Sequence, residues 1–411
     1  MALRSLFQNF YAFNEIAEVN PSRTIKKGTI TKYVSMESVE PRHKHVSKIE
    51  YRKYNGGSKF QNNDVLLARI TPSLEHGKTC IVDFLEEGMI GAGSTEFIVI
   101  SSRDGITLPD YIYYLTTSDL VREPAIKSMT GTSGRQRVDL NTFNSMLVPI
   151  PPISEQKAIA KILSDLDSKI ELNEKMNKTL EVIAQAIFKH WFIDFEFPDE
   201  NGKPYKSSGR EMVNSELGKI PKGWEIGTLG DHIVFTKGKK SIELQPNENL
   251  KLIPIISMEM LENGQCKFGV PMNMKIATKY DPIMVMDGAS SGRVEIGFEG
   301  IIGSTFASIT PNDNILSSFY LFGLLKYLEK VLRENTTGTS IPHADKNRIN
   351  KMQFLVPIKH IILKFDNIER AIIDKLSFNR NEIKNLIRIK ELLLPKLMTG
   401  KIRVPLEDEH E

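Results

Sequence analysis

The segment SEQKAIAKILSDLDSKIELNEKMNKTLEVIAQAIFKHW, from Ser154 to Trp191, carries a seven-residue apolar repeat. The repeat falls on Ile159, Leu166, Asn173, Leu180 and Ile187, and a second row beside it contains Leu163, Ile170, Ala184 and Trp191. A seven-residue step sustained over about four heptads predicts a helix that pairs with another helix as a coiled coil.

A second stretch near the end of the chain has the same pattern at an offset of 206 residues. Its step falls on Phe365, Ile372, Asn379, Leu386 and Leu393, with Leu376, Ile383 and Leu397 beside it. Asn173 and Asn379 are at matched places, and a polar Asn on an apolar seam sets register and partner at some cost in stability. The pattern favours pairing of the two helices, and the alternative is that each packs on its own globular block.

Sequence motifs outside the helices also recur in one order. The matched pairs are Thr130–Ser133 with Thr337–Ser340, Leu147–Ile150 with Leu355–Ile358, Val34–Glu37 with Ile256–Glu259, and Gly93–Thr95 with Gly303–Thr305. They lie about 206 to 222 residues apart. Self-similarity at a fixed spacing indicates an internal two-fold repeat.

Each half therefore has the same predicted layout, a mixed block followed by a long helix. Short strand-like runs such as Val65–Ala68, Phe97–Ile100 and Ile283–Met286 alternate with Gly, Pro and Asn-Asp turns, which predicts an α+β fold. The expected boundaries are 1–152 for the first block, 153–197 for the first helix, 198–220 for a polar linker, 221–358 for the second block, 359–400 for the second helix and 401–411 for an acidic tail. At about 1.5 Å per residue, the first helix spans on the order of 55 Å and would hold the blocks apart.

Composition limits the class of protein. The 411 residues are 40% hydrophobic and 26% charged, as in soluble globular proteins. No apolar run reaches the roughly 18 to 20 residues of a membrane helix, and the first residues do not resemble a signal peptide, so we expect a cytoplasmic protein without membrane contact. Cys80 and Cys266 are far apart with no nearby His cluster, which predicts neither a disulfide framework nor a zinc site.

The charge is unevenly distributed although the net value is only +3. Between Arg23 and Lys59, ten Lys and Arg residues face three Glu residues, a local excess of +7. Such a stretch is either a surface for phosphates or an ordinary solvated face, and charge alone leaves both open.

Motifs for chemistry are missing from the sequence. It contains no G-x-x-x-x-G-K-[ST] loop, no G-x-G-x-x-G after a strand, and no Asn/Asp-Pro-Pro-aromatic segment of the kind that adenine methyltransferases use. Asp199 with Glu382 and Lys384 could form a metal-dependent nuclease site, but Glu382 and Lys384 flank a seam residue of the second helix. We therefore predict no catalytic residues and no metal ligands.

Loop residues that could read DNA are present in both blocks. Arg and Lys suit guanine, Asn and Gln suit adenine, and hydroxyl and basic groups bind phosphates. The candidates in the first block are Lys44, Lys48, Arg52, Lys53, Arg69, Lys78, Ser133, Arg135, Gln136 and Arg137. Those in the second block are Lys237, Lys239, Lys240, Ser290, Arg293, Ser340, His343 and Lys346.

Several phrases carry a family resemblance over essentially the whole chain. They are GTSGRQRVDLNTFNSMLVPIPPISEQKAIAKIL from Gly131, DSKIELNEKMNKTLEVIAQAIFKHWFIDFEF from Asp167, ELGKIPKGWEIGTLGD from Glu216 and LLLPKLMTGKIRV from Leu392. With the order block, helix, block, helix, they resemble the specificity subunit (S, HsdS) of type I restriction-modification systems. The first block lacks the IPKGWE lead-in, and Lys359–Ile361 replaces the Pro-Pro-Ile that precedes the first helix.

The resemblance implies a fold and a function. The two blocks would be target-recognition domains that each read half of a bipartite site in double-stranded DNA, and the helices would pair as an antiparallel coiled coil. The implied partners are methyltransferase (M) subunits, two of them, that methylate adenine at N6, and restriction (R) subunits. S-adenosylmethionine, ATP and Mg would belong to those partners, so this chain would be non-catalytic and would bind no cofactor.

Two other functions remain open at this point. One is a coiled-coil adaptor that bridges protein partners without reading DNA, and the other is a self-contained methyltransferase or nuclease. Salt-sensitive, sequence-selective DNA binding would separate DNA reading from the adaptor function. Cofactor binding by the purified chain would favour the enzyme.

Overall fold

The chain forms two compact units in a computed structural model that describes residues 7, 9–132, 134–245, 251–334, 336–337 and 342–405. Unit 1 contains residues 1–171 together with 385–411, and unit 2 contains residues 172–384, as far as these ranges are described. The candidates Ser133 and Ser340 and the acidic tail from 406 onward lie outside the described residues.

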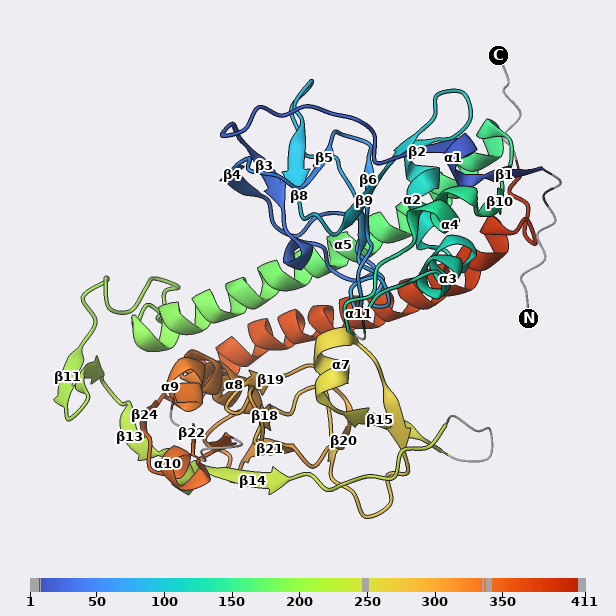
Figure 1. The fold of residues 1–411 in the computed structure, drawn as a ribbon. Helices are drawn as coiled ribbons and strands as arrows, with labels where there is room; N and C mark the ends of the chain where they lie inside the picture. The colour runs from blue at the N-terminus through green and yellow to red at the C-terminus, as the bar shows by residue number, and fades with distance from the viewer. Residues whose placement is uncertain are drawn as a thin grey trace. The chain divides into compact units, whose positions relative to one another are not determined.

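Unit 1 holds two four-stranded sheets (Figure 1). The first has the order β2 (Ala17–Val19), β9 (Phe97–Ser102), β6 (Val65–Ala68), β7 (Thr79–Ile81), and the second has the order β4 (Glu50–Lys53), β3 (Ile30–Val34), β8 (Gly91–Gly93), β5 (Ser58–Phe60). A further pair joins β1 (Phe10–Ala12) to β10 (Leu147–Pro149). The short helices are α1 (Phe13–Ile16), η1 (Met36–Ser38), α2 (Pro109–Thr117), α3 (Asp119–Lys127) and α4 (Leu140–Ser145).

Unit 2 repeats the two four-stranded sheets of unit 1 strand for strand. Its sheets are β14 (Ile233–Lys237), β21 (Phe306–Pro311), β18 (Ile283–Val285), β19 (Val294–Glu295) and β16 (Lys267–Gly269), β15 (Ile253–Ile256), β20 (Gly300–Ile302), β17 (Ile276–Ala277). The pair β13 (Glu225–Thr228) and β24 (Gln353–Val356) corresponds to β1 and β10. The helices are α6 (Leu229–His232), α7 (Met258–Asn263), α8 (Ser318–Tyr327), α9 (Glu329–Glu334) and α10 (Lys346–Asn350).

The repeated Gly-Ser-Thr motif has a structural reason in this topology. In each unit one strand pair is parallel, β3 with β8 and β15 with β20, and the motif begins where that pair ends. A Cβ on Gly93 would lie 3.1 Å from the carbonyl oxygen of Val34, and one on Gly303 would lie 2.5 Å from that of Ile256. A side chain at Gly303 would clash with the facing backbone and one at Gly93 would be crowded, so glycine suits this close approach in both units. The internal repeat expected from sequence is therefore confirmed.

The two long helices have the predicted positions and the predicted buried faces. They are α5 (Ile153–Phe188), extended by a π-helical turn at Lys189–Ile193, and α11 (Lys359–Met398). In unit 1, Ile159 and Leu163 share a core with Leu397 and Met398. The first turns of α5 therefore pack against the last turns of α11 in this unit.

In unit 2 the opposite ends of the two helices meet. Ala184 of α5 packs with Ile372 and Leu376 of α11, while Phe188 and Phe365 lie together in the main core of this unit. Taken in either unit, the pairing is antiparallel, as the fold prediction required. The helices also pack on the globular blocks, so the two packing modes considered from sequence occur together.

The polar stretch predicted as a linker contains ordered structure. β11 (Met212–Ser215) and β12 (Gly218–Pro221) form a hairpin, and Ile220 lies in the unit 2 core with Trp224. None of the helices in the described part of the chain combines the length and apolarity that a membrane span requires.

Candidate nucleic-acid interface

Two loops that were predicted separately from the sequence as candidate DNA contacts lie next to each other in unit 1. The Val138 amide donates to the Arg69 carbonyl (2.9 Å), and the Thr71 amide donates to the Gln136 carbonyl (3.1 Å). Ile70 also pairs with Arg137 as an isolated β-bridge. The backbone thus brings the Arg69–Lys78 loop together with Arg135, Gln136 and Arg137.

Arg137 is held by a carboxylate in this loop pair. Its Nε and Nη2 atoms donate to Glu96 at distances of 2.7 to 3.1 Å, a two-point contact. The Arg137 side chain is 45% exposed and that of Glu96 is 22% exposed. The hydrogen bonds to Glu96 raise the pKa of Arg137, so the guanidinium stays charged. We call Arg137 and Glu96 the first cluster.

In unit 2, side chains from three segments form a cluster that corresponds to the first cluster of unit 1. His343 Nδ1 is 2.7 Å from an Asp287 oxygen, and Lys237 Nζ is 3.0 Å from the other oxygen of the same carboxylate. The Gly288 amide donates to the Pro342 carbonyl (2.9 Å), which fixes the Asp287–Arg293 loop beside His343. Lys237, Asp287 and His343 are the second cluster.

Electrostatics keeps Asp287 ionised. Its burial acts to raise the pKa, but the hydrogen bonds from His343 and Lys237 outweigh burial and hold the pKa below the ordinary value of an aspartate. An ionised carboxylate accepts hydrogen bonds only, so Nδ1 of His343 is the donor in this contact. Nε2 is therefore the imidazole nitrogen that stays available to a ligand.

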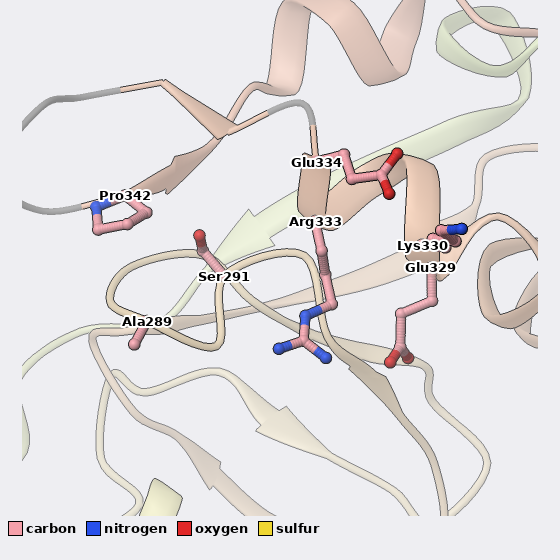
Figure 2. Close-up of a pocket in the computed structure, with 7 residues that line it drawn as sticks. All are labelled: Ala289, Ser291, Glu329, Lys330, Arg333, Glu334 and Pro342. Atoms are coloured by element: carbon pink, nitrogen blue, oxygen red, sulfur yellow. The ribbon is translucent and has the colours of Figure 1, made fainter.

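A cavity of about 460 Å³ is lined in part by the Asp287–Arg293 loop (Figure 2). Its described lining residues are Ala289, Ser291, Glu329, Lys330, Arg333, Glu334 and Pro342. Figure 2 shows the Arg333 side chain between Ser291 and Glu329. The Ser291 hydroxyl is buried and has no hydrogen-bond partner among the described residues. Lys330 and Arg333 add two exposed cations that the sequence candidates did not include.

Four candidates have side chains that are buried or held by neighbouring groups of the protein. Lys44 is buried, and its ammonium contacts Asp110 and Ser164, both at 2.8 Å. Lys78 Nζ donates to the Met36 carbonyl (2.8 Å), and Arg69 Nη2 donates to that of Val138 (3.4 Å). Arg293 is paired with Glu295 at 2.8 Å. These residues hold the loops in place in this structure, so we leave them out of the interface proposed below.

The basic stretch Arg23–Lys59 is not one free surface. Arg23 pairs with Asp64, Lys32 with Glu86, and Arg42 with Glu391. Carboxylates that lie outside the stretch in sequence thus offset much of its charge excess. The solvated-face interpretation fits these residues better than a phosphate-binding stripe.

The remaining candidates are exposed or partly exposed. Strand β4 carries Arg52, which stacks over the Tyr33 ring at 4.4 Å and pairs with Glu50, and its neighbours Lys48 and Lys53 are exposed. In unit 2, Lys346 lies 5.5 Å from the Phe235 ring centre. The other residues of this group are Arg135, Gln136, Lys239, Lys240 and Ser290.

The seam asparagines lie where the heptads predicted. Asn173 and Asn379 are fully buried in unit 2. Asn173 donates to Glu382 (2.7 Å), Asn379 donates to Asn177 (2.9 Å), and the Oδ1 atom of each has no partner in the described part of the chain. A buried amide with one unpaired oxygen costs stability, and the role of the two asparagines in setting the register stays a prediction.

Sequence reasoning missed the carboxylates that hold the two clusters. Glu96 directly follows the repeated motif Gly93–Thr95, and Asp287 begins the nominated loop of unit 2. Their closeness to these motifs was the available signal. Within the described ranges no three His, Cys, Asp or Glu side chains gather as metal ligands would.

Comparison with known proteins gives consistent matches. A family model described as the type I restriction modification DNA specificity domain matches residues 8–182 and again 221–393. The type I restriction enzyme MjaIX specificity subunit of Methanocaldococcus jannaschii is 30% identical over 319 residues, which is 74% of this chain and 71% of that protein. The HindI specificity subunit of Haemophilus influenzae is 25% identical over 424 residues, 88% and 91% of the two chains.

One solved structure supports the fold. The crystal structure of the type I restriction-modification system S subunit from M. genitalium aligns with a TM-score of 0.58 at 16% identity. The alignment covers 97% of this chain and 98% of that chain.

Proposed function

We propose that this chain, which belongs to the family of type I restriction modification DNA specificity proteins, selects the DNA sequence on which methyltransferase and restriction subunits act. Its two matched regions, 8–182 and 221–393, would each read one half of a bipartite site in double-stranded DNA. The family is a DNA-recognition component and not a catalytic subunit. Methylation of adenine at N6, with S-adenosylmethionine, and ATP- and Mg-dependent cleavage would belong to the partner subunits.

One observation carries this proposal. Each unit has the same strand order and places a partly exposed nitrogen-bearing side chain, Arg137 or His343, against a carboxylate where two loops meet. Side chains that can reach base edges are needed for sequence reading, and loops on a rigid sheet scaffold hold them in place. Two copies of such a surface, one in each unit, would match a DNA site that consists of two half-sites.

We also propose the bounds of the recognition domains, the surface for the partner subunits and the residues that contact DNA. The recognition domains would correspond to 1–152 and 221–358, and the helices 153–197 and 359–400 would supply the surface for two methyltransferase subunits. DNA contacts would come from Lys48, Arg52, Lys53, Arg135, Gln136, Arg137, Lys237, Lys239, Lys240, Ser290, His343 and Lys346. A protein that acts on chromosomal DNA would be located in the cytoplasm.

Methylation mapping tests the proposal. DNA from a host with and without this chain, each with the methyltransferase partner, is sequenced for N6-methyladenine. We expect methylation at one bipartite motif with a fixed gap, and a new sequence in one half when residues 221–358 are exchanged for those of a relative. Unchanged methylation with an active partner would reject the proposal and favour the adaptor without DNA reading.

A DNA-binding measurement gives an independent check. Binding of the complex to its motif should weaken steeply as salt rises, because Lys and Arg contacts to phosphates release counterions. Equal affinity for motif and scrambled DNA at every salt concentration would contradict sequence reading.

A further inference from the structure

We infer that Arg137 and His343 are equivalent base-reading residues, one for each half of the DNA site, and that Glu96 and Asp287 position them. This inference rests on the proposed function and adds the residue and the kind of base that each unit recognises. It distinguishes these two side chains from the exposed lysine and arginine side chains, which would contact phosphates.

The two residues occupy the same place in the repeated fold. Arg137 pairs through its backbone with Thr130 on one side and Ile70 on the other. His343 pairs with Thr337 on one side and Asp287 on the other. Thr130 and Thr337 begin the repeated Thr-Gly-Thr-Ser motif, so the equivalence follows from both sequence and pairing.

The flanking strands confirm the register of this equivalence. Ile70 lies two residues beyond Ala68, which pairs with Phe97, and Asp287 lies two residues beyond Val285, which pairs with Phe306. Phe97 and Phe306 are the first residues of β9 and β21, the matched central strands. Arg137 and His343 are therefore attached to corresponding points of corresponding sheets.

Each residue is held on one side and exposed on the other. The side chains of Arg137 and His343 are 45% and 51% exposed, whereas Glu96 and Asp287 are only 22% and 23% exposed. A carboxylate that accepts a hydrogen bond from such a side chain fixes its orientation, as an outer-shell partner fixes a metal-binding histidine. Surface ion pairs of this kind contribute little to stability, so positioning is the effect that matters.

The chemistry of Arg137 fits guanine. Its guanidinium has five N–H donors, and Glu96 engages the Nε and Nη2 side, which leaves the Nη1 side and the remaining Nη2 proton. Two adjacent donors in a fixed plane match the O6 and N7 acceptors of guanine in the major groove. Lysine has no such planar fork, so it should not replace Arg137.

The chemistry of His343 fits a different base. With Nδ1 donating to Asp287, the neutral imidazole offers Nε2 as an acceptor. The amino groups of adenine N6 and cytosine N4 are the matching donors in the major groove. One fold with a different side chain at one matched place would thus read different bases in the two halves of the target.

The test uses the full chain in complex with its methyltransferase partner at pH 8. Targets carrying all four bases at each motif position are methylated in one pool and sequenced. We expect Arg137→Ala to make a single guanine position of the first half-site degenerate, with a loss of discrimination of roughly 10- to 100-fold, and to leave the second half-site unchanged. Arg137→Lys should not restore the preference. His343→Ala should relax one adenine or cytosine position of the second half-site only.

Two further variants separate base reading from other roles. Glu96→Gln should partly relax the same position as Arg137→Ala, a change that a purely structural residue would not cause. Arg135→Ala, an exposed arginine two residues away, should lower methylation evenly over all sequences, as loss of a phosphate contact does.

Other outcomes overturn the inference. An even loss over all bases for Arg137→Ala, or an unchanged motif for either alanine variant, would show that these residues do not read bases while the proposed function stands. A wild-type complex with no motif at all would reject the proposed function itself. The intact half-site serves as the internal control for folding in each variant.

Discussion

The paired helices α5 and α11 bury different polar residues in the two units, although the same heptad pattern runs through both units. In unit 1 it buries Asp167, whose carboxylate accepts from Lys390 (2.5 Å) and from the Tyr114 hydroxyl (2.8 Å). In unit 2 it buries Asn173, Asn379 and Glu369, and each has a buried oxygen without a partner in the described chain. The helix pair therefore satisfies its buried Asp167 in unit 1, whereas in unit 2 it leaves three buried oxygens without a partner among the described residues, at a cost in stability.

Removing one member of the satisfied network should have the largest effect. Lys390→Met leaves the Asp167 carboxylate buried with only the Tyr114 hydrogen bond. We expect unit 1 to lose about 3 kcal/mol of stability, since breaking a buried ion pair by removing one partner is strongly destabilising. Hydrogen exchange over residues 153–171 measures the loss, with Lys375→Met, an exposed lysine of the same helix, as the control. Equal protection in both variants would remove the contrast between the units.

Neutralising Glu369 should stabilise unit 2, and the effect should depend on pH. Burial, with a smaller contribution from Asp366, raises the pKa of Glu369 from 4.5 to about 7. Below pH 4.5 both folded and unfolded forms are protonated, so there is no penalty. Between pH 4.5 and 7 the unfolded state loses its proton first, and above pH 7 the full cost of burying the charge is present.

Glu369→Gln should therefore stabilise unit 2 by about 3 kcal/mol at pH 8, because the pKa rises from 4.5 to about 7 and each pKa unit corresponds to roughly 1.4 kcal/mol. The gain should vanish near pH 4.5. Urea unfolding at the two pH values tests this, with Glu391→Gln, an exposed residue of the same helix, as the control. A gain that is equal at both pH values would show that charge burial is not its cause.

Gly323 marks another difference between the units. It is the sixth residue of α8, and the sixth residue of α2 is Tyr114, the partner of Asp167. A Cβ at Gly323 would lie 2.2 Å from the Phe188 ring, so Gly323→Ala overfills the unit 2 core. We expect a loss of about 2 kcal/mol, measured by thermal unfolding. A variant as stable as wild type would mean that Phe188 has room to move.

The smallest effect should come from exchanging one matched strand residue. Ser308 in β21 is fully buried with an unpartnered hydroxyl among the described atoms, and its counterpart in β9 is Val99. Ser308→Val should stabilise unit 2 by about 1 kcal/mol, because it removes an unsatisfied polar group and adds apolar surface. The reverse exchange, Val99→Ser, should destabilise unit 1. If both exchanges change the unfolding midpoint in the same direction, the correspondence of the two cores is weaker than the pairing suggests.

Periodicity predicted the long helices and their buried faces well because local apolar spacing determines them. Glu369 was overlooked because a polar residue at a seam position looks like a gap in an apolar pattern. Short strands such as β19 and β17, with two residues each, leave little periodic signal, and their pairing depends on contacts distant in sequence. Motif repetition predicted the two-fold organisation without showing the sheet order.

The candidate site was predicted in part. Loops containing Arg137 and His343 were identified from their basic residues and matched motifs, and the structure brings each beside a second nominated loop. Lys44 illustrates what sequence could not show, since only the folded chain places Asp110 and Ser164 around its ammonium. Charge counts cannot tell a cation that faces solvent from one that is neutralised by a distant carboxylate.

The chain segments that make up each unit determine the order in which the units are completed during synthesis. Unit 2 is one continuous segment, so all of its contacts are available once Lys384 has left the ribosome. Unit 1 begins to form first, yet Leu397 and Met398 belong to its core beside Ile159 and Leu163. The half that is translated first is thus finished last, and until then its part of α5 exposes an apolar face that chaperones can bind.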